Sequence, residues 1–149
     1  MVEARTILLV EDNPDDRDLT ARALDKIGVA SRLVTAFDGF DALDYLFATG
    51  PHAGRDASHL PAVVLLDLHL PRTDGFGLLR RLRADERTRL LPVVILTSSG
   101  DEQGIAKSYR LGANSFVRKP VDPDEFSEAV RLLGVYWCGL NQPPPNQSQ

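Results

Sequence analysis

Short apolar runs alternate with longer amphipathic stretches along the chain. Five runs have the length and composition of β-strands, and they cover residues 6–10, 31–36, 62–66, 93–96 and 115–117. The first, third and fourth runs are apolar at nearly every position, which is typical of strands buried on both faces of a sheet. Each gap between runs can hold a helix, so the pattern predicts βαβ units with right-handed crossovers and parallel strands.

The amphipathic stretches predict one helix after each strand. The first helix starts at Asn13-Pro14, where asparagine is a good N-cap and proline fits the first helical position, and Gly28 is expected to stop it. Two more are expected near residues 42–47 and 76–82. The fourth, at 101–111, has a weak apolar face, and the fifth follows the i, i+3, i+4, i+7 rule. The fourth helix is expected to face inward with Ile105, Tyr109 and Leu111. The fifth is expected to face inward with Phe126, Ala129, Val130 and Leu133. The expected fold class is α/β, with a five-stranded parallel sheet, doubly wound, and five helices.

Length and composition indicate one domain. The chain has 149 residues, of which 43% are hydrophobic and 26% charged, as in ordinary globular proteins. We expect a single domain over residues 1–140. Residues 141–149 (NQPPPNQSQ) are polar and proline-rich, which predicts a disordered tail. Residues 50–60 lack periodicity and are expected to form a surface loop.

Charge and cysteine content exclude several classes of protein. The net charge of -4 favours neither nucleic acid nor an anionic membrane as a partner. A lone cysteine, Cys138, precludes an internal disulfide, and no Cys/His group has zinc-site spacing. The N-terminus lacks the layout of a signal peptide, and no apolar run approaches the ~18 residues that span a bilayer. We therefore expect a cytoplasmic protein.

Polar side chains gather where the predicted strands end. Glu11 and Asp12 follow the first strand, Asp67 follows the third, and Thr97 and Lys119 follow the fourth and fifth. In open α/β sheets, functional groups collect at the carboxyl ends of the strands. We therefore expect these five side chains to form one site.

The residue types at this site favour phosphoryl chemistry with a hard cation. Three close carboxylates repel one another unless a cation joins them, and oxygen-only ligands suit Mg²⁺ or Mn²⁺ better than zinc. A bound ion would screen an incoming phosphoryl group, so that Asp67 could attack phosphorus. Thr97 and Lys119 would donate to the phosphoryl oxygens. Pro120 permits a cis peptide bond that would turn Lys119 inward, and the sequence leaves the isomer open.

The set Glu11-Asp12, Asp67, Thr97 and Lys119-Pro120 resembles the signature of receiver domains in two-component response regulators, over roughly residues 5–135. The resemblance implies a flavodoxin-like fold of the chemotaxis type, with Asp67 as phosphoacceptor. It also implies that Glu11, Asp12, Asp67 and the backbone carbonyl of His69 hold Mg²⁺, and that Thr97 and Lys119 contact the phosphoryl group. Phe116 stands at the switch position, where many members carry tyrosine. Without a hydroxyl, its switching would work through burial alone, as it rotates into space that Thr97 leaves.

A finer resemblance is to stand-alone response regulators paired with bacterial phytochromes. It is carried by residues 8–14 (LLVEDNP), 112–116 (GANSF) and 119–122 (KPVD), by the long loop before the third strand, and by Tyr136-Trp137. It implies a phytochrome-type histidine kinase as partner and signalling through protein contacts. Such a protein is not an enzyme beyond its own Mg²⁺-dependent phosphorylation and dephosphorylation. His69 and Ser99 would flank the path of the attacking water, and we expect them to set the dephosphorylation rate.

Other functions remain open or fit less well. The chain could act as a phosphate sink without an output of its own. A haloacid-dehalogenase-like hydrolase would need a second acid two residues after Asp67, where His69 stands. A nucleotide-binding domain would need a glycine-rich loop after the first strand, and residues 11–14 (EDNP) lack one. No basic domain follows the fifth helix to bind DNA.

Several residues have simpler structural roles available. Asp12 and Asp74 could be helix caps, Thr97 and Phe116 strand residues, and Lys119 a solvated lysine. Aspartates 15, 16 and 18 are interpreted as a solvated helix start, and the three histidines as exposed loop residues. The last helix carries extra apolar residues, namely Leu132, Val135, Tyr136, Trp137 and Leu140. They either close the core or form a homodimer surface with the fourth helix and fifth strand.

Overall fold

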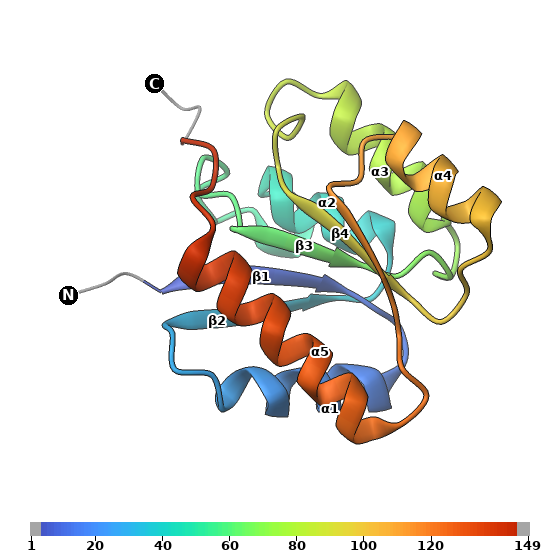
Figure 1. The fold of residues 1–149 in the computed structure, drawn as a ribbon. Helices are drawn as coiled ribbons and strands as arrows, with labels where there is room; N and C mark the ends of the chain where they lie inside the picture. The colour runs from blue at the N-terminus through green and yellow to red at the C-terminus, as the bar shows by residue number, and fades with distance from the viewer. Residues whose placement is uncertain (1–3, 146–149) are drawn as a thin grey trace.

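A parallel sheet of five strands forms the centre of the molecule, which confirms the expected α/β class (Figure 1). The computed structural model describes residues 4–145. The strand order is β2-β1-β3-β4-β5. The strands are β1 (Arg5–Val10), β2 (Ser31–Ala36), β3 (Val63–Leu66), β4 (Val93–Thr97) and β5 (Ser115–Arg118). Because the order reverses at β1, the crevice between the carboxyl ends of β1 and β3 is the switch point where such sheets bind ligands.

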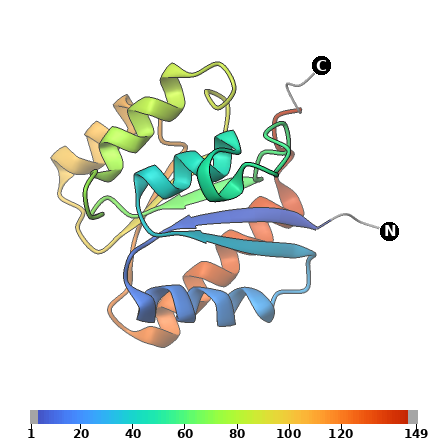
Figure 2. The same cartoon turned by 180° about the vertical axis from the view of Figure 1, so that it is seen from behind.

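Helices cover both faces of the sheet (Figures 1 and 2). One face carries α1 (Pro14–Asp25) and α5 (Pro123–Val135), and the other carries α2 (Gly39–Phe47), α3 (Gly75–Ala84) and α4 (Glu102–Arg110). Successive residues of β1 enter opposite cores: Leu8 packs beneath α2 and α3, while Leu9 packs beneath α1 and α5. This alternation explains why the central strands are apolar at every position.

Aspartate or asparagine caps all five helices at their N-termini. The Asn13 side chain accepts from the backbone N–H groups of Asp15 and Asp16, as the sequence predicts. α1 ends at Asp25, before the expected stop at Gly28. Asp101 caps α4, whose face differs from the expected one. Tyr109 is 50% exposed, and the fully buried residue is Ser108, which donates a hydrogen bond to the Gly104 carbonyl. The expectation that Tyr109 faces inward was wrong, because the buried position of α4 is occupied by the small residue Ser108.

The chain after α5 runs along the amino-terminal edge of the sheet. A π-helical turn, η2 (Tyr136–Leu140), buries Cys138, and Arg5 Nη1 donates to the Asn141 carbonyl over 2.7 Å. Prolines 143–145 line a cavity of about 830 Å³ at this edge. The rest of the tail that we expect to be disordered, 146–149, lies outside the described residues. Within residues 4–145, no helix has the length and apolar composition that a membrane crossing requires.

Candidate functional site

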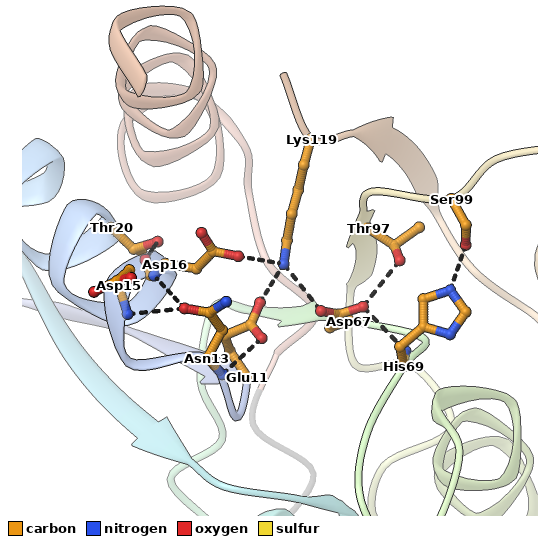
Figure 3. A network of polar contacts seen from close by, with 10 residues as sticks. All are labelled: Glu11, Asn13, Asp15, Asp16, Thr20, Asp67, His69, Thr97, Ser99 and Lys119. Atoms are coloured by element: carbon orange, nitrogen blue, oxygen red, sulfur yellow. Dashed lines mark hydrogen bonds and ion pairs between the residues drawn. The ribbon is translucent and has the colours of Figure 1, made fainter. Parts of the chain in front are cut away.

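Strand register brings the expected site residues together. Val10 pairs with Leu66 across β1 and β3, so Glu11 and Asp67 leave adjacent strands at the same level. Thr97 ends β4 and pairs with Arg118 of β5, which places Lys119 just beyond the same edge. Figure 3 shows these side chains converging on Asp67. The structure therefore confirms their proximity, while their chemical roles stay predictions.

The Asp67 side chain is only 9% exposed, and its carboxylate accepts three hydrogen bonds. Its Oδ1 accepts from Thr97 Oγ1 at 2.9 Å and from the His69 backbone N–H at 3.0 Å, and its Oδ2 accepts from Lys119 Nζ at 2.9 Å. Burial alone would raise the pKa of Asp67. The His69 N–H and the Lys119 ammonium outweigh burial and hold that pKa below its usual range. The lowered pKa keeps Asp67 a carboxylate anion at neutral pH.

Lys119 joins the carboxylates of three segments. Its Nζ donates to Glu11, to Asp16 Oδ2 at 2.8 Å and to Asp67 Oδ2 at 2.9 Å. Burial would lower the pKa of Lys119, but these three carboxylates raise it above its usual range. Every peptide bond in the described range is trans, including the one before Pro120. The isomer that the sequence left open is thus trans, and Lys119 still points into the site.

Asp16 is the site residue that the sequence interpretation missed. The sequence predicts it to be a solvated residue at a helix start, but it lies in the first turn of α1 and its carboxylate accepts a hydrogen bond from Lys119 (Figure 3). The available signal was its spacing. A residue four positions after Asp12, on a helix that begins at the same strand end, faces back toward that strand end.

Glu11 is the acid of this cluster whose pKa is raised. Its Oε2 accepts from the Asn13 backbone N–H at 3.1 Å, and its other oxygen accepts from Lys119. Burial raises the pKa of Glu11 to about 7, the negative charge of Asp67 adds to this rise, and Lys119 opposes it. The raised pKa of Glu11 agrees with simple charge counting: three carboxylates surround one ammonium, so the cluster has an excess of negative charge.

The donor set suits a hard divalent ion. Glu11, Asp67 and Asp12 supply carboxylate oxygens, and the Asp12 carboxylate makes no hydrogen bond or ion pair with any residue between 4 and 145. No three acidic, histidine or cysteine side chains in that range are arranged to hold a metal ion. The reason is visible in Figure 3, where the Lys119 ammonium lies between Glu11 and Asp67. The residues fit Mg²⁺ or Mn²⁺ chemically, provided that Lys119 releases Glu11.

Two further groups border the site. His69 Nε2 and Ser99 Oγ are 2.6 Å apart and connect the loops after β3 and β4. Phe116, on β5, is half-buried against the core. The Thr97 hydroxyl donates to Asp67 Oδ1 on the neighbouring strand end.

The loop after β3 packs tightly against the site. A Cβ at Gly75 would lie 2.6 Å from the Asp67 carbonyl oxygen, so only glycine lets α3 start so close to the phosphoacceptor candidate. Arg72, in the same loop, pairs with the buried carboxylate of Asp38 at the end of β2. The sequence interpretation missed this pair, because nothing in the spacing of residues 38 and 72 predicts a contact.

The chain is similar to known receiver domains. A model of the response regulator receiver domain matches residues 7–131. Three similar solved structures are named as response regulators. The bacteriophytochrome response regulator AtBRR is 50% identical with a TM-score of 0.73, covering 95% of this chain and 100% of that one. The phosphorylated cyanobacterial phytochrome response regulator RcpA is 32% identical with a TM-score of 0.88, covering 96% and 100%. Mn²⁺-bound Rcp1, a protein of Synechocystis, is 28% identical with a TM-score of 0.87, covering 95% and 99%.

Curated relatives differ in length. The probable methanogenesis regulatory protein FilR2 of Methanothrix harundinacea is 39% identical over 138 residues, which are 93% of this chain and 86% of that protein. The chain spans about half the length of several relatives that are named as transcriptional regulators.

Proposed function

Because the chain belongs to the response regulator receiver family, we propose that it is a signalling switch that accepts a phosphoryl group on Asp67 from a histidine kinase. The observation that carries the proposal is the anchoring of one buried carboxylate by Thr97 and Lys119 at the carboxyl edge of the sheet. A hydroxyl and an ammonium on opposite oxygens of one carboxylate are the donors that a phosphoryl group on that carboxylate needs.

The proposed reaction transfers phosphorus between two side chains. An Asp67 oxygen forms a bond to phosphorus while the bond from phosphorus to the donor histidine nitrogen breaks, and that nitrogen keeps the electron pair. The Thr97 hydroxyl and the Lys119 ammonium then donate to phosphoryl oxygens. A Thr97 side chain drawn toward the phosphoryl group leaves room for Phe116 to rotate inward, and this movement would carry the signal to the surface of β5.

Chemical mapping tests the proposed acceptor. The unaltered chain is incubated with phosphoramidate and MgCl₂, and the acyl phosphate is reduced with borohydride, which converts a phosphorylated aspartate to homoserine. Peptide mass spectrometry should find homoserine at position 67. Homoserine at another aspartate, or a chain that never gains a phosphoryl group, would contradict the proposal.

We propose that Glu11, Asp12, Asp67 and the His69 carbonyl hold Mg²⁺ or Mn²⁺. Support comes from the oxygen-only donor set and from the Mn²⁺-bound state of the similar protein Rcp1. A bound ion would screen the charge of an incoming phosphoryl group and polarise its oxygens. The protein's own part is to keep the Asp12 carboxylate free of other partners and to move Lys119 away from Glu11.

Asp12→Ala is expected to weaken Mn²⁺ binding by at least about 10-fold, because losing even an outer-shell partner of a metal costs about 10–100-fold. The free Mn²⁺ signal in electron paramagnetic resonance measures the affinity. Asp15→Ala is the matched control, since Asp15 is an exposed acid in the first turn of α1. Equal Mn²⁺ affinities for the two variants would contradict the ligand role of Asp12.

His69 and Ser99 are expected to control the phosphoryl lifetime. Their 2.6 Å contact spans the loops that border Asp67, so it limits the approach of water. Replacing both by alanine should shorten the lifetime by about 3–10-fold, the equivalent of one hydrogen bond of roughly 0.7–1.4 kcal/mol. Loss of label after removal of the phosphodonor measures the rate. A lifetime equal to that of the unaltered chain would rule out this role.

We propose a phytochrome-type histidine kinase as the partner. The similar structures AtBRR and RcpA are themselves named as phytochrome response regulators. Transfer rates from a panel of autophosphorylated histidine kinases would test this, and the fastest donor should be of the phytochrome type. If a phytochrome kinase transfers no faster than the others, the chain could instead drain phosphate from several kinases as a sink. The third alternative, an aspartyl-phosphate hydrolase, is disfavoured by His69 at the position of its second acid.

We propose a homodimer through the last helix, with α4 and β5 beside it. Leu132, Tyr136 and Leu140 are 54%, 47% and 69% exposed and recur every four residues along α5 and η2, whereas Trp137 packs on the core. Leu132→Glu is expected to lower the association state measured by light scattering. Leu90→Glu is the control, because Leu90 is equally exposed outside this face. An unaltered chain that stays monomeric at high concentration, phosphorylated or not, would contradict the dimer.

A further inference from the structure

We propose that Phe37 and Phe40, with the guanidinium groups of Arg17 and Arg72, form the docking surface for the phosphohistidine-bearing face of the donor kinase. We name these four residues the aromatic rim. The inference rests on the proposed function, because it identifies the surface that would bring the donor histidine to Asp67.

The two phenylalanine rings lie on the surface at the carboxyl edge of the sheet. Phe37 directly follows β2 and Phe40 lies in the first turn of α2, and they are 52% and 51% exposed. Figure 2 shows β2 leading into α2 at this edge. A single exposed apolar residue is ordinary. Two half-exposed phenylalanines within four residues leave apolar area in water that a partner could cover.

Each ring is covered on one side by a cation. The Arg17 guanidinium lies 4.6 Å from the Phe37 ring centroid, and that of Arg72 lies 5.2 Å from the Phe40 centroid. Arg72 is itself anchored by the buried carboxylate of Asp38. The rim therefore joins α1, the β2–α2 segment and the β3–α3 loop, and each ring already packs against a cation within the free chain. Such preorganisation lowers the entropy cost of binding.

The polar groups around this segment are incompletely satisfied. Two side-chain atoms within residues 4–145 are buried without a hydrogen-bond partner, Arg17 Nε and Thr73 Oγ1. Arg17 covers Phe37, and Thr73 contacts the segment between the two rings, where a Cβ on Gly39 would overlap its hydroxyl. Buried polar groups without a partner are rare and costly. No side-chain hydrogen bond or ion pair engages Arg17 within residues 4–145, so its charge is available to a partner.

The short distance between the aromatic rim and Asp67 indicates which partner binds at the rim. β2 and β3 are separated by β1 alone, so the rim begins about 10 Å from Asp67, twice the spacing of neighbouring strands. A standard interface covers about 800 Å² on each partner, a disc of roughly 16 Å radius. Asp67 lies at this edge with a side chain that is 9% exposed, so a footprint of that size centred on Asp67 reaches the rim. A second copy of this chain seated there would block the transfer.

Charge favours the same occupant. Arg17 has no ion pair within residues 4–145 and places a positive group beside an acidic pocket that would otherwise repel a phosphorylated protein, whereas Arg72 is already paired with Asp38. We therefore expect the donor to present apolar side chains to the two rings and a carboxylate to Arg17 beside its phosphohistidine.

Comparing a protein donor with a small one tests the rim. Phe37→Ala/Phe40→Ala is expected to lower kcat/KM for transfer from an autophosphorylated bacteriophytochrome histidine kinase by about 10–100-fold, as for aromatic hot spots. Labelling by phosphoramidate with Mg²⁺ should stay within about 2-fold, since small donors need no docking surface. Tyr109→Ala is the matched control, because Tyr109 is also a half-exposed aromatic residue but lies on α4.

Three results would separate the possibilities. A double variant that receives phosphorus from the kinase at the unaltered rate would overturn the docking surface and leave the proposed function intact. A double variant that loses self-association but not kinase transfer would show that a second copy occupies the rim, which also overturns the inference. An unaltered chain that neither phosphoramidate nor any histidine kinase labels would contradict the proposed function itself.

Discussion

Asp67→Asn is expected to reduce phosphoryl labelling by at least about 100-fold, from phosphoramidate and from a histidine kinase alike, because an amide is a far weaker nucleophile than a carboxylate. The asparagine oxygen can still accept from Thr97 and from the His69 N–H, so the architecture of the site should survive. The variant also removes one of three carboxylates around a single ammonium. Its unfolding temperature should therefore be no lower than that of the unaltered chain.

Intact mass spectrometry after incubation with phosphoramidate and MgCl₂ measures this effect. Asp74→Asn is the matched control, because Asp74 belongs to the same loop, is exposed and caps α3, and asparagine caps helices equally well. The control should label at the normal rate. Normal labelling of Asp67→Asn would falsify the acceptor assignment.

Lys119→Met is expected to destabilise the fold by about 3–5 kcal/mol at neutral pH, the usual cost of removing one partner from a buried ion pair. The Lys119 side chain is 8% exposed, and among residues 4–145 it is the one cation paired with Glu11 and Asp67, which are 3% and 9% exposed. Methionine fills similar volume, so the loss reflects uncompensated charge more than a cavity. Phosphoryl labelling should fall as well, because a donor to the phosphoryl oxygens is gone.

The pH dependence of this destabilisation identifies its cause. Without Lys119, burial and mutual repulsion would raise the pKa values of Glu11 and Asp67 in the folded state above their unfolded values. Protonation then relieves the penalty, so the stability difference between variant and unaltered chain should be greatest near pH 8 and shrink toward pH 5. In the unaltered chain the pKa of Asp67 is lowered, so that carboxylate stabilises the fold above its unfolded pKa and loses this contribution as the pH falls through the folded value.

Urea unfolding followed by circular dichroism, in EDTA at several pH values, measures both effects. Lys26→Met is the control, because it removes the same charge from an exposed position at the end of α1, and it should change stability by less than about 0.5 kcal/mol. A stability difference for Lys119→Met that grows as the pH falls would show that buried charge is not the cause.

The sheet could be predicted from the sequence because its signal is local and periodic. Residues 6–10 and 93–96 are apolar without interruption, and they differ from the observed β1 and β4 by one residue at an end. Strand ends follow from the same pattern, so the meeting of Glu11, Asp67, Thr97 and Lys119 could be predicted as well. α4 was harder, because its buried face rests on Ser108, which has no apolar signature.

What escaped prediction depends on side-chain reach across the fold. Asp16 contacts Lys119 although 103 residues separate them, and Arg72 reaches Asp38 across 34 residues. Periodicity carries no information about such pairs, because long flexible side chains select partners only after the backbone has placed them. The trans bond before Pro120 is a similar case, since both isomers are open to a proline until its neighbours pack.

The pairing of Val10 with Leu66 also determines which parts of this molecule can change freely. Side chains alternate across a strand, so losing one residue within β3 would turn Asp67 away from Glu11 and into the opposite layer. Residues 53–58, by contrast, lie in turns and loop before β3, and no rung of the ladder depends on their number. Loop length and phosphoryl chemistry are thus separable traits, and insertions could remodel one flank of the molecule while the alignment of its reactive oxygens stays constant.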